Sequence, residues 1–138
     1  MPAPSLELLR SPALRRVAVA NPDRAPYGRA AVAALTSLKL YDSLRARLVT
    51  AENIAQTAQF VDSGNADAGL ISLTSALTPR LSADGKYVVM PENSYPPLLQ
   101  GAIVIKQASG ADEAHEFLAF LLSPPIRRQL ADRGLTAP

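Results

Sequence analysis

The chain has 138 residues, of which 48% are hydrophobic and 19% are charged, and its formal net charge is +2. This balance is typical of a globular domain rather than of a disordered chain. Basic and acidic residues (14 and 12) are interspersed and aromatic residues make up only 5%, so the sequence predicts no nucleic-acid groove and no stacking surface for bases.

Several kinds of site are excluded by residue types that are missing or scarce. The chain has no cysteine and a single histidine, His115, which rules out disulfides, thiolate metal sites, cysteine nucleophiles and histidine clusters. No apolar run approaches the roughly 18 residues of a membrane span. Residues 1–10 lack the basic start and apolar core of a signal peptide. We therefore expect no direct metal ligands, no cofactor and no membrane-spanning segment.

The first half of the chain predicts strands that alternate with helices. We expect a linker or short helix over residues 1–15, a strand over 16–20 and an amphipathic helix over 27–40, whose apolar residues recur at helical spacing. The following elements are expected at residues 41–46 (short helix), 47–50 (strand), 53–63 (helix, closed by Gly64-Asn65) and 67–73 (strand).

The second half predicts two further strands and two C-terminal helices. A single helical turn at 74–77 should stop at Pro79, and the remaining elements are expected at 86–90 and 102–106 (strands), and at 111–122 and 124–133 (helices). Strands alternating with helices are typical of an α/β fold, here a three-layer sandwich with a mainly parallel sheet.

Two joints between a strand and a helix, at residues 21–28 and 48–54, are candidates for holding an anion. The first turn of a helix has N–H groups without an intrahelical partner, at the positive end of the helix dipole. In parallel sheets, ligands bind beyond the carboxyl ends of the strands, where both joints lie. The backbone N–H groups of Tyr27, Gly28, Asn53 and Ile54 are the expected donors, and Gly28 would let a ligand approach the backbone.

Plainer interpretations stand beside this one. Each joint can be only a helix N-terminus that packs against the sheet. Ser72, with neighbouring hydroxyls, can donate to a ligand or can cap a turn.

The charged residues beside the joints also have ordinary interpretations. Asp23 and Glu52 can be an acid–base pair, but turn-forming and helix-start roles are favoured. Arg24 and Arg29 can attract an anion or form a solvated helix face. His115 lies on a core-packing helix and is interpreted as a surface or boundary residue. Because no nucleophile, base and orienting group come together, we do not expect an enzyme.

Five segments, at 17–22, 25–31, 52–60, 63–69 and 95–97, together closely resemble the molybdate-binding periplasmic proteins of ABC importers. The resemblance implies a type II substrate-binding fold, in which two α/β lobes close on molybdate or tungstate. It places the family's backbone contacts on Tyr27 and Ile54, and a further contact near Ser72, where some relatives have tyrosine.

The resemblance covers the second lobe and the C-terminal part only. It implies a linker from a missing first lobe (1–15), an anion-binding lobe (16–106) and C-terminal helices (107–138). It further implies periplasmic location, an ABC permease as partner at the membrane periphery, and weak oxyanion binding by the chain alone. Self-association through the face left by the missing lobe is expected. The alternative function is a ligand-sensing effector domain of a transcriptional regulator with the same fold.

Overall fold

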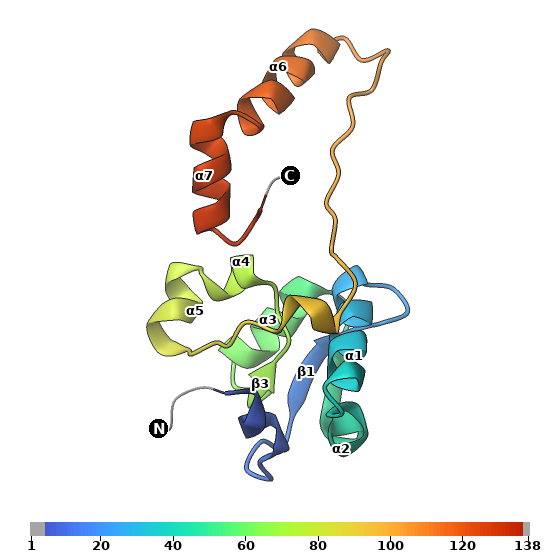
Figure 1. Ribbon diagram of the computed structural model, residues 1–138, viewed down its shortest axis with the longest axis vertical. Coiled ribbons are helices and arrows are strands. Elements are labelled where there is room, and N and C mark those ends of the chain that lie inside the picture. Colours follow the sequence, from blue (N-terminus) through green and yellow to red (C-terminus); the bar gives the residue numbers. More distant parts are fainter. Residues whose placement is uncertain (1–4, 137–138) are drawn as a thin grey trace. The chain divides into compact units, whose positions relative to one another are not determined.

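The computed structural model describes residues 5–136. The chain divides into two compact units, Met1–Leu98 and Leu99–Pro138, which we describe separately (Figure 1). The first unit contains the sheet and the elements around it. The second consists of an extended segment and two helices.

A three-stranded parallel sheet forms the centre of the first unit. Strands β1 (Val17–Ala20), β2 (Leu48–Ala51) and β3 (Ala68–Gly69) lie in the order β2-β1-β3. All four residues of β1 are buried, which explains why this strand is a run of alanine and valine rather than an alternating pattern. The predicted α/β class with a parallel sheet is confirmed.

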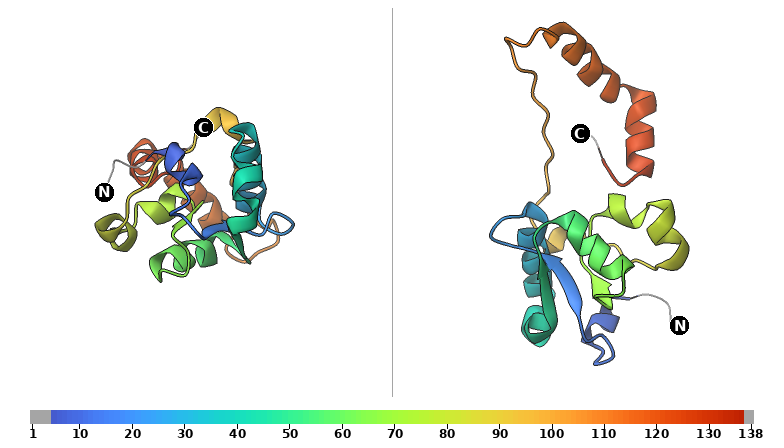
Figure 2. Two further views of the ribbon diagram at one scale, coloured as in Figure 1. Left: turned by 90° about the horizontal axis from the view of Figure 1, so that it is seen from below. Right: turned by 180° about the vertical axis from the view of Figure 1, so that it is seen from behind.

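Helices α1 (Pro26–Ser37) and α3 (Ile54–Asp62) cover opposite faces of this sheet (Figures 1 and 2). Strand β2 lies on one side of β1 and β3 lies on the other, so the connection from β2 to β3 crosses β1 in the direction opposite to the connection from β1 to β2. Since parallel crossovers are right-handed, this reversal places the two helices on opposite faces. The loops after β1 and β2 therefore diverge from neighbouring strands, at the kind of position where open α/β sheets bind ligands.

Leucines from α1 and the following short elements supply much of the core. Helix α2 (Tyr41–Leu44) and the 3₁₀ turn η2 (Arg45–Arg47) lead from α1 into β2. The central buried cluster consists of Val17, Leu35, Leu40 and Leu44. Partly buried Leu9 and Leu14 from the N-terminal segment pack against it, so this segment belongs to the first unit.

The N-terminal segment, which includes the 3₁₀ turn η1 (Leu6–Arg10), is fastened by one guanidinium group. Arg47 donates hydrogen bonds to the backbone oxygens of Ser11 (2.8 Å), Leu14 (2.7 Å) and Leu9 (3.3 Å), and also to that of Ser43. Residues 5–14 are thus held against the region before β2. Their predicted role as a linker between lobes stays a prediction.

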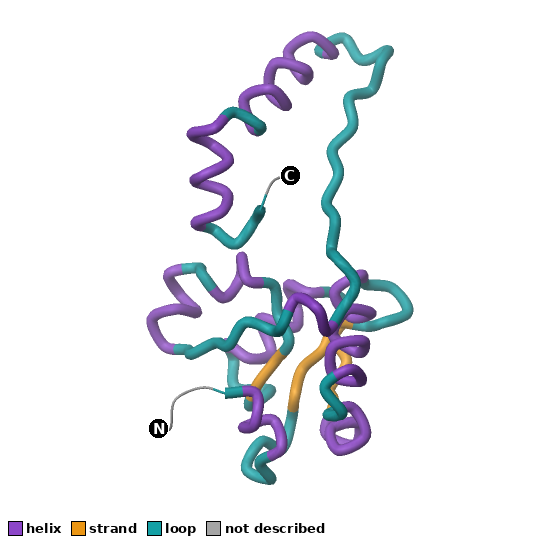
Figure 3. The backbone as a smooth tube through the Cα atoms, viewed as in Figure 1, coloured by secondary structure: helices purple, strands orange, loops and turns teal. Residues whose placement is uncertain are grey.

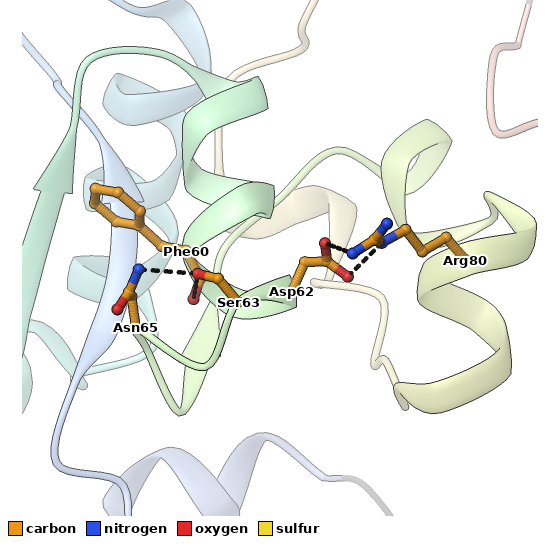
Figure 4. Close-up of polar contacts among 5 residues, drawn as sticks. All are labelled: Phe60, Asp62, Ser63, Asn65 and Arg80. Carbon is orange, nitrogen blue, oxygen red and sulfur yellow. Dashed lines mark hydrogen bonds and ion pairs between the residues drawn. The ribbon is translucent and has the colours of Figure 1, made fainter.

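Helix α3 ends at a glycine and is tied to a helix that the sequence pattern did not predict. Gly64 has φ of 73°, the left-handed conformation common after a helix. Asp62 forms a bidentate pair with Arg80, with Oδ1 to Nε at 2.9 Å and Oδ2 to Nη2 at 2.8 Å (Figure 4). Figure 4 also shows Asn65 Nδ2 donating to Ser63 Oγ at 2.9 Å, and Ser63 Oγ donating to the backbone oxygen of Phe60 at 3.4 Å.

Arg80 belongs to α5 (Pro79–Asp84), which follows α4 (Leu73–Ala76). The single turn predicted at 74–77 corresponds to α4 and ends before Pro79, but the sequence analysis predicted no helix that begins at Pro79. Proline occupies the first turn of a new helix, where its missing N–H costs no hydrogen bond.

Three predicted strands differ from the structure. The strand expected at 67–73 is reduced to Ala68–Gly69, and residues 86–90 and 102–106 belong to no strand (Figure 3). The short 3₁₀ turn η3 (Glu92–Ser94) lies in the proline-rich loop after residues 86–90. A strand needs a hydrogen-bonding neighbour, and within residues 5–136 none pairs with these two segments.

The second unit contains α6 (Ala111–Leu121) and α7 (Pro124–Asp132), close to their predicted bounds. The rings of Phe117 and Phe120 lie 6.5 Å apart on α6. His115 is exposed, in agreement with its interpretation as a surface residue. Among the described helices, none combines the length and apolar character needed to cross a membrane.

The end of α1 offers a test of backbone strain. Lys39 follows the helix with φ of 55°, and the N–H of Leu40 bonds back to Leu35 O at 2.8 Å. Left-handed backbone favours glycine, so Lys39→Gly should stabilise the chain by about 0.5–1 kcal/mol in urea denaturation. The control Ser37→Gly, in the last helical turn, should destabilise it by a similar amount. Destabilisation by both changes would contradict this account.

A carboxylate at the amino end of the sheet makes stability depend on pH. Asp67 Oδ2 accepts the N–H groups of Arg16 and Arg15, at 2.8 Å each, and the bond from Arg16 is the main cause that lowers the pKa of Asp67 below 3.8. A carboxyl group with a lowered pKa stabilises the fold above its unfolded-state pKa, and this contribution is lost as pH falls through the lowered value.

Asp67→Asn keeps one acceptor oxygen but removes the charge. The variant should be less stable than the parent chain near neutral pH, and the difference should shrink as the pH falls below about 4. Urea denaturation across this range measures the free energy of unfolding of both proteins. A difference that is independent of pH would show that charge on Asp67 plays no part.

Candidate functional site

The carboxyl edge of the sheet brings the two predicted helix-start joints together. The N–H of Asn21, which follows β1, donates to the backbone oxygen of Ala51 at the end of β2, at 2.7 Å. This bond extends the ladder between the two strands by one residue. The starts of α1 and α3 are thereby held at adjacent positions.

Asn21 also shapes the loop that leads into α1. Its side-chain Oδ1 accepts the N–H of Asp23 at 2.9 Å, and its backbone oxygen accepts the N–H groups of Arg24 (3.2 Å) and Ala25 (2.8 Å). The turn-forming interpretation of Asp23 agrees with this geometry. Asn21 thus connects the end of β1 with β2 and with the residues just before α1, including its N-cap Ala25.

Gly28 packs the first turn of α1 directly onto the end of β1. A Cβ atom at this position would lie 2.3 Å from the backbone oxygen of Ala20 and 2.7 Å from that of Asn21, so no larger residue fits without displacement. Its N–H donates to Ala25 O at 3.0 Å. The glycine therefore permits close approach of the chain's own backbone, and a role in approach of a ligand stays a prediction.

The start of α3 leaves backbone donors open. Asn53 caps the helix, with its Oδ1 accepting the N–H of Gln56 at 2.9 Å. Gln56 Oε1 in turn accepts the N–H of Glu52 at 2.7 Å. Within residues 5–136, the N–H groups of Ile54 and Ala55 have no hydrogen-bond acceptor, so they are available to an anion.

Gln56 is a site residue that our sequence reasoning missed. The spacing of asparagine and glutamine in Asn53-Ile-Ala-Gln56 is that of a capping box, a signal that was present in the sequence. Its effect is to occupy the N–H groups on either side of the helix start. The donors left over are those of Asn53 and of the first two helical residues.

Ser72 adopts the capping role that was one of its two predicted interpretations. It is 6% exposed, and its Oγ accepts the N–H of Ser75 at 3.2 Å while lying 2.8 Å from Ser75 Oγ and 2.9 Å from Thr74 Oγ1. The hydroxyl is therefore engaged within the turn that begins α4. Donation to a ligand by Ser72 stays a prediction.

Two of the predicted site residues line a hollow of the first unit. Tyr27, which is half-buried, and Ser72 both line a groove of about 870 Å³. A smaller hollow of about 250 Å³ is lined by Ala55 and Ser75, with the Asp62–Arg80 pair at its wall. Gly28, Asn53 and Ile54 line neither hollow.

The chemistry of this edge suits an anion better than a cation. Its groups are backbone N–H donors and hydroxyls, while Asp23 and Glu52 are exposed. Arg24 and Arg29 are also exposed, as a solvated helix face requires. In the part of the chain that the structure describes, no three histidine or acidic side chains gather to hold a metal ion.

Gln56 allows a direct test of how the start of α3 is organised. Gln56→Ala should remove the bond to the N–H of Glu52 and destabilise the chain by about 1 kcal/mol, whereas Gln56→Glu should retain it. Gln59→Ala, an exposed position one turn later, is the matched control and should change stability by less than about 0.5 kcal/mol. Urea denaturation measures all three. Equal effects at positions 56 and 59 would contradict the capping role.

Sequence comparison connects this fold with transport proteins. A family model described as bacterial extracellular solute-binding protein matches residues 2–136. The chain is 32% identical over 111 residues to the molybdate-binding protein ModA of Rhodobacter capsulatus, covering 80% of this chain and 43% of that protein. It is 32% identical over 117 residues to ModA of Azotobacter vinelandii, covering 85% of this chain and 46% of that protein.

Solved structures agree with the sequence comparison. The Azotobacter vinelandii periplasmic molybdate-binding protein superposes with a TM-score of 0.84 at 30% identity, covering 96% of this chain and 58% of that chain. The substrate-binding domain of a putative molybdenum ABC transporter from Clostridium difficile gives a TM-score of 0.72 at 25% identity, covering 97% of this chain and 58% of that chain.

The chain spans about half the length of the relatives that it matches. The family consists of binding proteins, in agreement with the prediction of a binding rather than a catalytic function. The family match over residues 2–136 and the close superposition lead to one assignment: this chain belongs to the bacterial extracellular solute-binding proteins and resembles their molybdate-binding members.

Proposed function

We propose that this chain supplies half of an oxyanion site in the solute-binding component of an ABC importer for molybdate or tungstate. The observation that carries the proposal is the pair of helix starts at neighbouring strand ends, with the N–H groups of Ile54 and Ala55 open to an acceptor. Similarity to molybdate-binding proteins supports the choice of ligand. The proposed location is the periplasm, with an ABC permease as partner.

The proposed contacts are the backbone of Tyr27, Asn53 and Ile54, with Gly28 and Ser72 beside them. Among these, Gly28 contributes mainly by letting α1 approach β1, because its own N–H is bonded to Ala25. Ser72 contributes its hydroxyl only if its cap is rearranged. The strongest donor position is therefore the start of α3.

A site made of donors selects for the charge state of its ligand. A fully ionised tetrahedral dianion accepts hydrogen bonds on every oxygen, whereas a protonated phosphate also needs an acceptor for its own hydroxyl. Molybdate and tungstate satisfy such a site as dianions. Discrimination from sulfate then depends on size, which the spacing of two lobes sets.

Half a site binds weakly. If two charge-assisted hydrogen bonds of about 1.5–3 kcal/mol each come from a second lobe, their loss lowers the affinity roughly 10²–10⁴-fold. Closure around the ion is lost as well. Self-association through apolar surface normally covered by that lobe stays a prediction beside this one.

Titration of the ¹⁵N-labelled chain with molybdate, tungstate, sulfate and phosphate tests the proposal by NMR. We expect shifts of the amide signals at residues 26–28 and 53–55, with a dissociation constant well above the micromolar range. Molybdate and tungstate should act most strongly. Submicromolar binding by the chain alone would contradict the half-site, and an absence of shifts with every oxyanion at high concentration would contradict the site itself.

Substitutions at Ile54 distinguish the contribution of its backbone N–H to ligand binding from that of its side chain. Ile54 is the first residue of α3 and follows Asn53 in an extended conformation, a context that accepts proline. Ile54→Pro removes the backbone N–H, whereas Ile54→Ala removes most of the side chain and keeps the backbone N–H. The proline variant should bind molybdate roughly tenfold to a hundredfold more weakly than the alanine variant in the same titration. Equal affinities would exclude this N–H as a contact.

A further inference from the structure

A threonine occupies the most buried position of α3. The exposed fraction of Thr57 is 0%, and among the residues of this helix, all of which the structure describes, it is the one that is buried. A fully buried position is normally filled by an apolar side chain, because a hydroxyl there needs a hydrogen-bond partner. The contact that the Thr57 hydroxyl makes is therefore set by the fold.

This hydroxyl donates to a carbonyl oxygen at the start of the helix. Thr57 Oγ1 lies 2.9 Å from Asn53 O, and the same oxygen accepts the backbone N–H of Thr57 at 3.1 Å. An α-helix ordinarily gives each carbonyl oxygen one donor, from the residue four positions later. The oxygen of Asn53 thus has two donors, and both belong to Thr57.

The oxygen of Asn53 belongs to the peptide group that carries the N–H of Ile54. A peptide group is planar, and in its trans form the C=O and the N–H point in opposite directions. A donor at the oxygen polarises the group and strengthens the N–H at the other end as a donor, by roughly 10–30% per bond. Of the open N–H groups at residues 53–55, that of Ile54 is therefore the one strengthened by both bonds from Thr57.

The same peptide group is also held in orientation. Asn53 Oδ1 accepts the N–H of Gln56 at 2.9 Å, and Gln56 Oε1 accepts the N–H of Glu52 at 2.7 Å. Rotation of the peptide between Asn53 and Ile54 would break the bonds to Thr57, which is buried and packed in place. The N–H of Ile54 is thus directed before any ligand arrives, and such preorganisation lowers the cost of binding.

A second threonine makes the same kind of bond away from any helix start. Thr36 Oγ1 donates to Val32 O at 2.8 Å, near the end of α1, and its side chain is exposed. Threonine in a helix commonly forms this bond to the oxygen four residues earlier. Thr57 differs from Thr36 in the peptide that it contacts, so Thr36 is a matched control.

We propose that Thr57 is a positioning residue of the oxyanion site, and that its hydroxyl acts through Asn53 O to direct and strengthen the N–H of Ile54. This inference rests on the proposed function, because it concerns a contact of the same site. Thr57 is fully buried and does not itself touch the ligand. Its hydroxyl makes the N–H of Ile54 the strongest of the three open donors.

Variants of the full 138-residue chain, labelled with ¹⁵N and titrated with molybdate, test the proposal. Thr57→Val removes the hydroxyl and nearly keeps the shape, so molybdate binding should weaken about twofold to fivefold. Its midpoint in urea denaturation should change little, because Asn53 O keeps the N–H of Thr57 as a donor.

Two further variants separate binding from stability. Thr57→Ser keeps the hydroxyl and removes a buried methyl group, so it should bind molybdate like the parent chain although it unfolds at lower urea. Thr36→Val removes the equivalent bond in α1 and should leave the affinity unchanged. A residue that only stabilises α3 would not give this pattern, in which affinity follows the hydroxyl and stability follows the methyl group.

The outcomes distinguish this inference from the proposed function. If the parent chain binds molybdate and Thr57→Val binds it equally well, the positioning role is overturned while the site stands. The same holds if Thr57→Ser loses as much affinity as Thr57→Val. If no oxyanion shifts the signals of the parent chain, the proposed function fails, and Thr57 has no site to position.

Discussion

The contact between the first turn of α1 and the carboxyl end of β1 is the constraint on which the candidate site depends. Gly28 lies where any Cβ atom would meet the backbone oxygens of Ala20 and Asn21, so the helix start and the strand end are joined backbone to backbone. The N–H of Asn21 then links this region to the end of β2 by donating to the backbone oxygen of Ala51. The two helix starts are therefore fixed by main-chain contacts, which side-chain motion does not relax.

The hydrogen bonds around each helix start decide which donors remain for a ligand. In α1, proline supplies no N–H and Gly28 donates within the first turn. In α3, the exchange between Asn53 and Gln56 occupies the N–H groups of Glu52 and Gln56 and leaves those of residues 53–55. Capping thus has two effects, since it stabilises the helix and also selects its open donors. An anion at such a site interacts with dipoles held by the fold and needs no charged side chain.

The elements that could be predicted from the sequence are those whose signals lie within the element itself. Helices α1, α3, α6 and α7 were predicted within a few residues, because their apolar spacing and end signals lie within the helix itself. α5 was missed because Pro79 was interpreted as a stop rather than as a first-turn residue. The role of Gly28 was missed for a different reason, since the atoms that surround it come from β1 and no local pattern reveals them.

The failed strand predictions and the difficulty of recognising the proposed oxyanion site from sequence have one physical origin. A strand is stabilised by a neighbour that the sequence of the strand does not specify, and residues 86–90 have the composition of a strand without that neighbour. The proposed oxyanion site is non-local in the same sense, since its donors come from two helix starts that are positioned by separate strands. A chain that spans about half the length of its relatives can form its helices and its first three strands by itself.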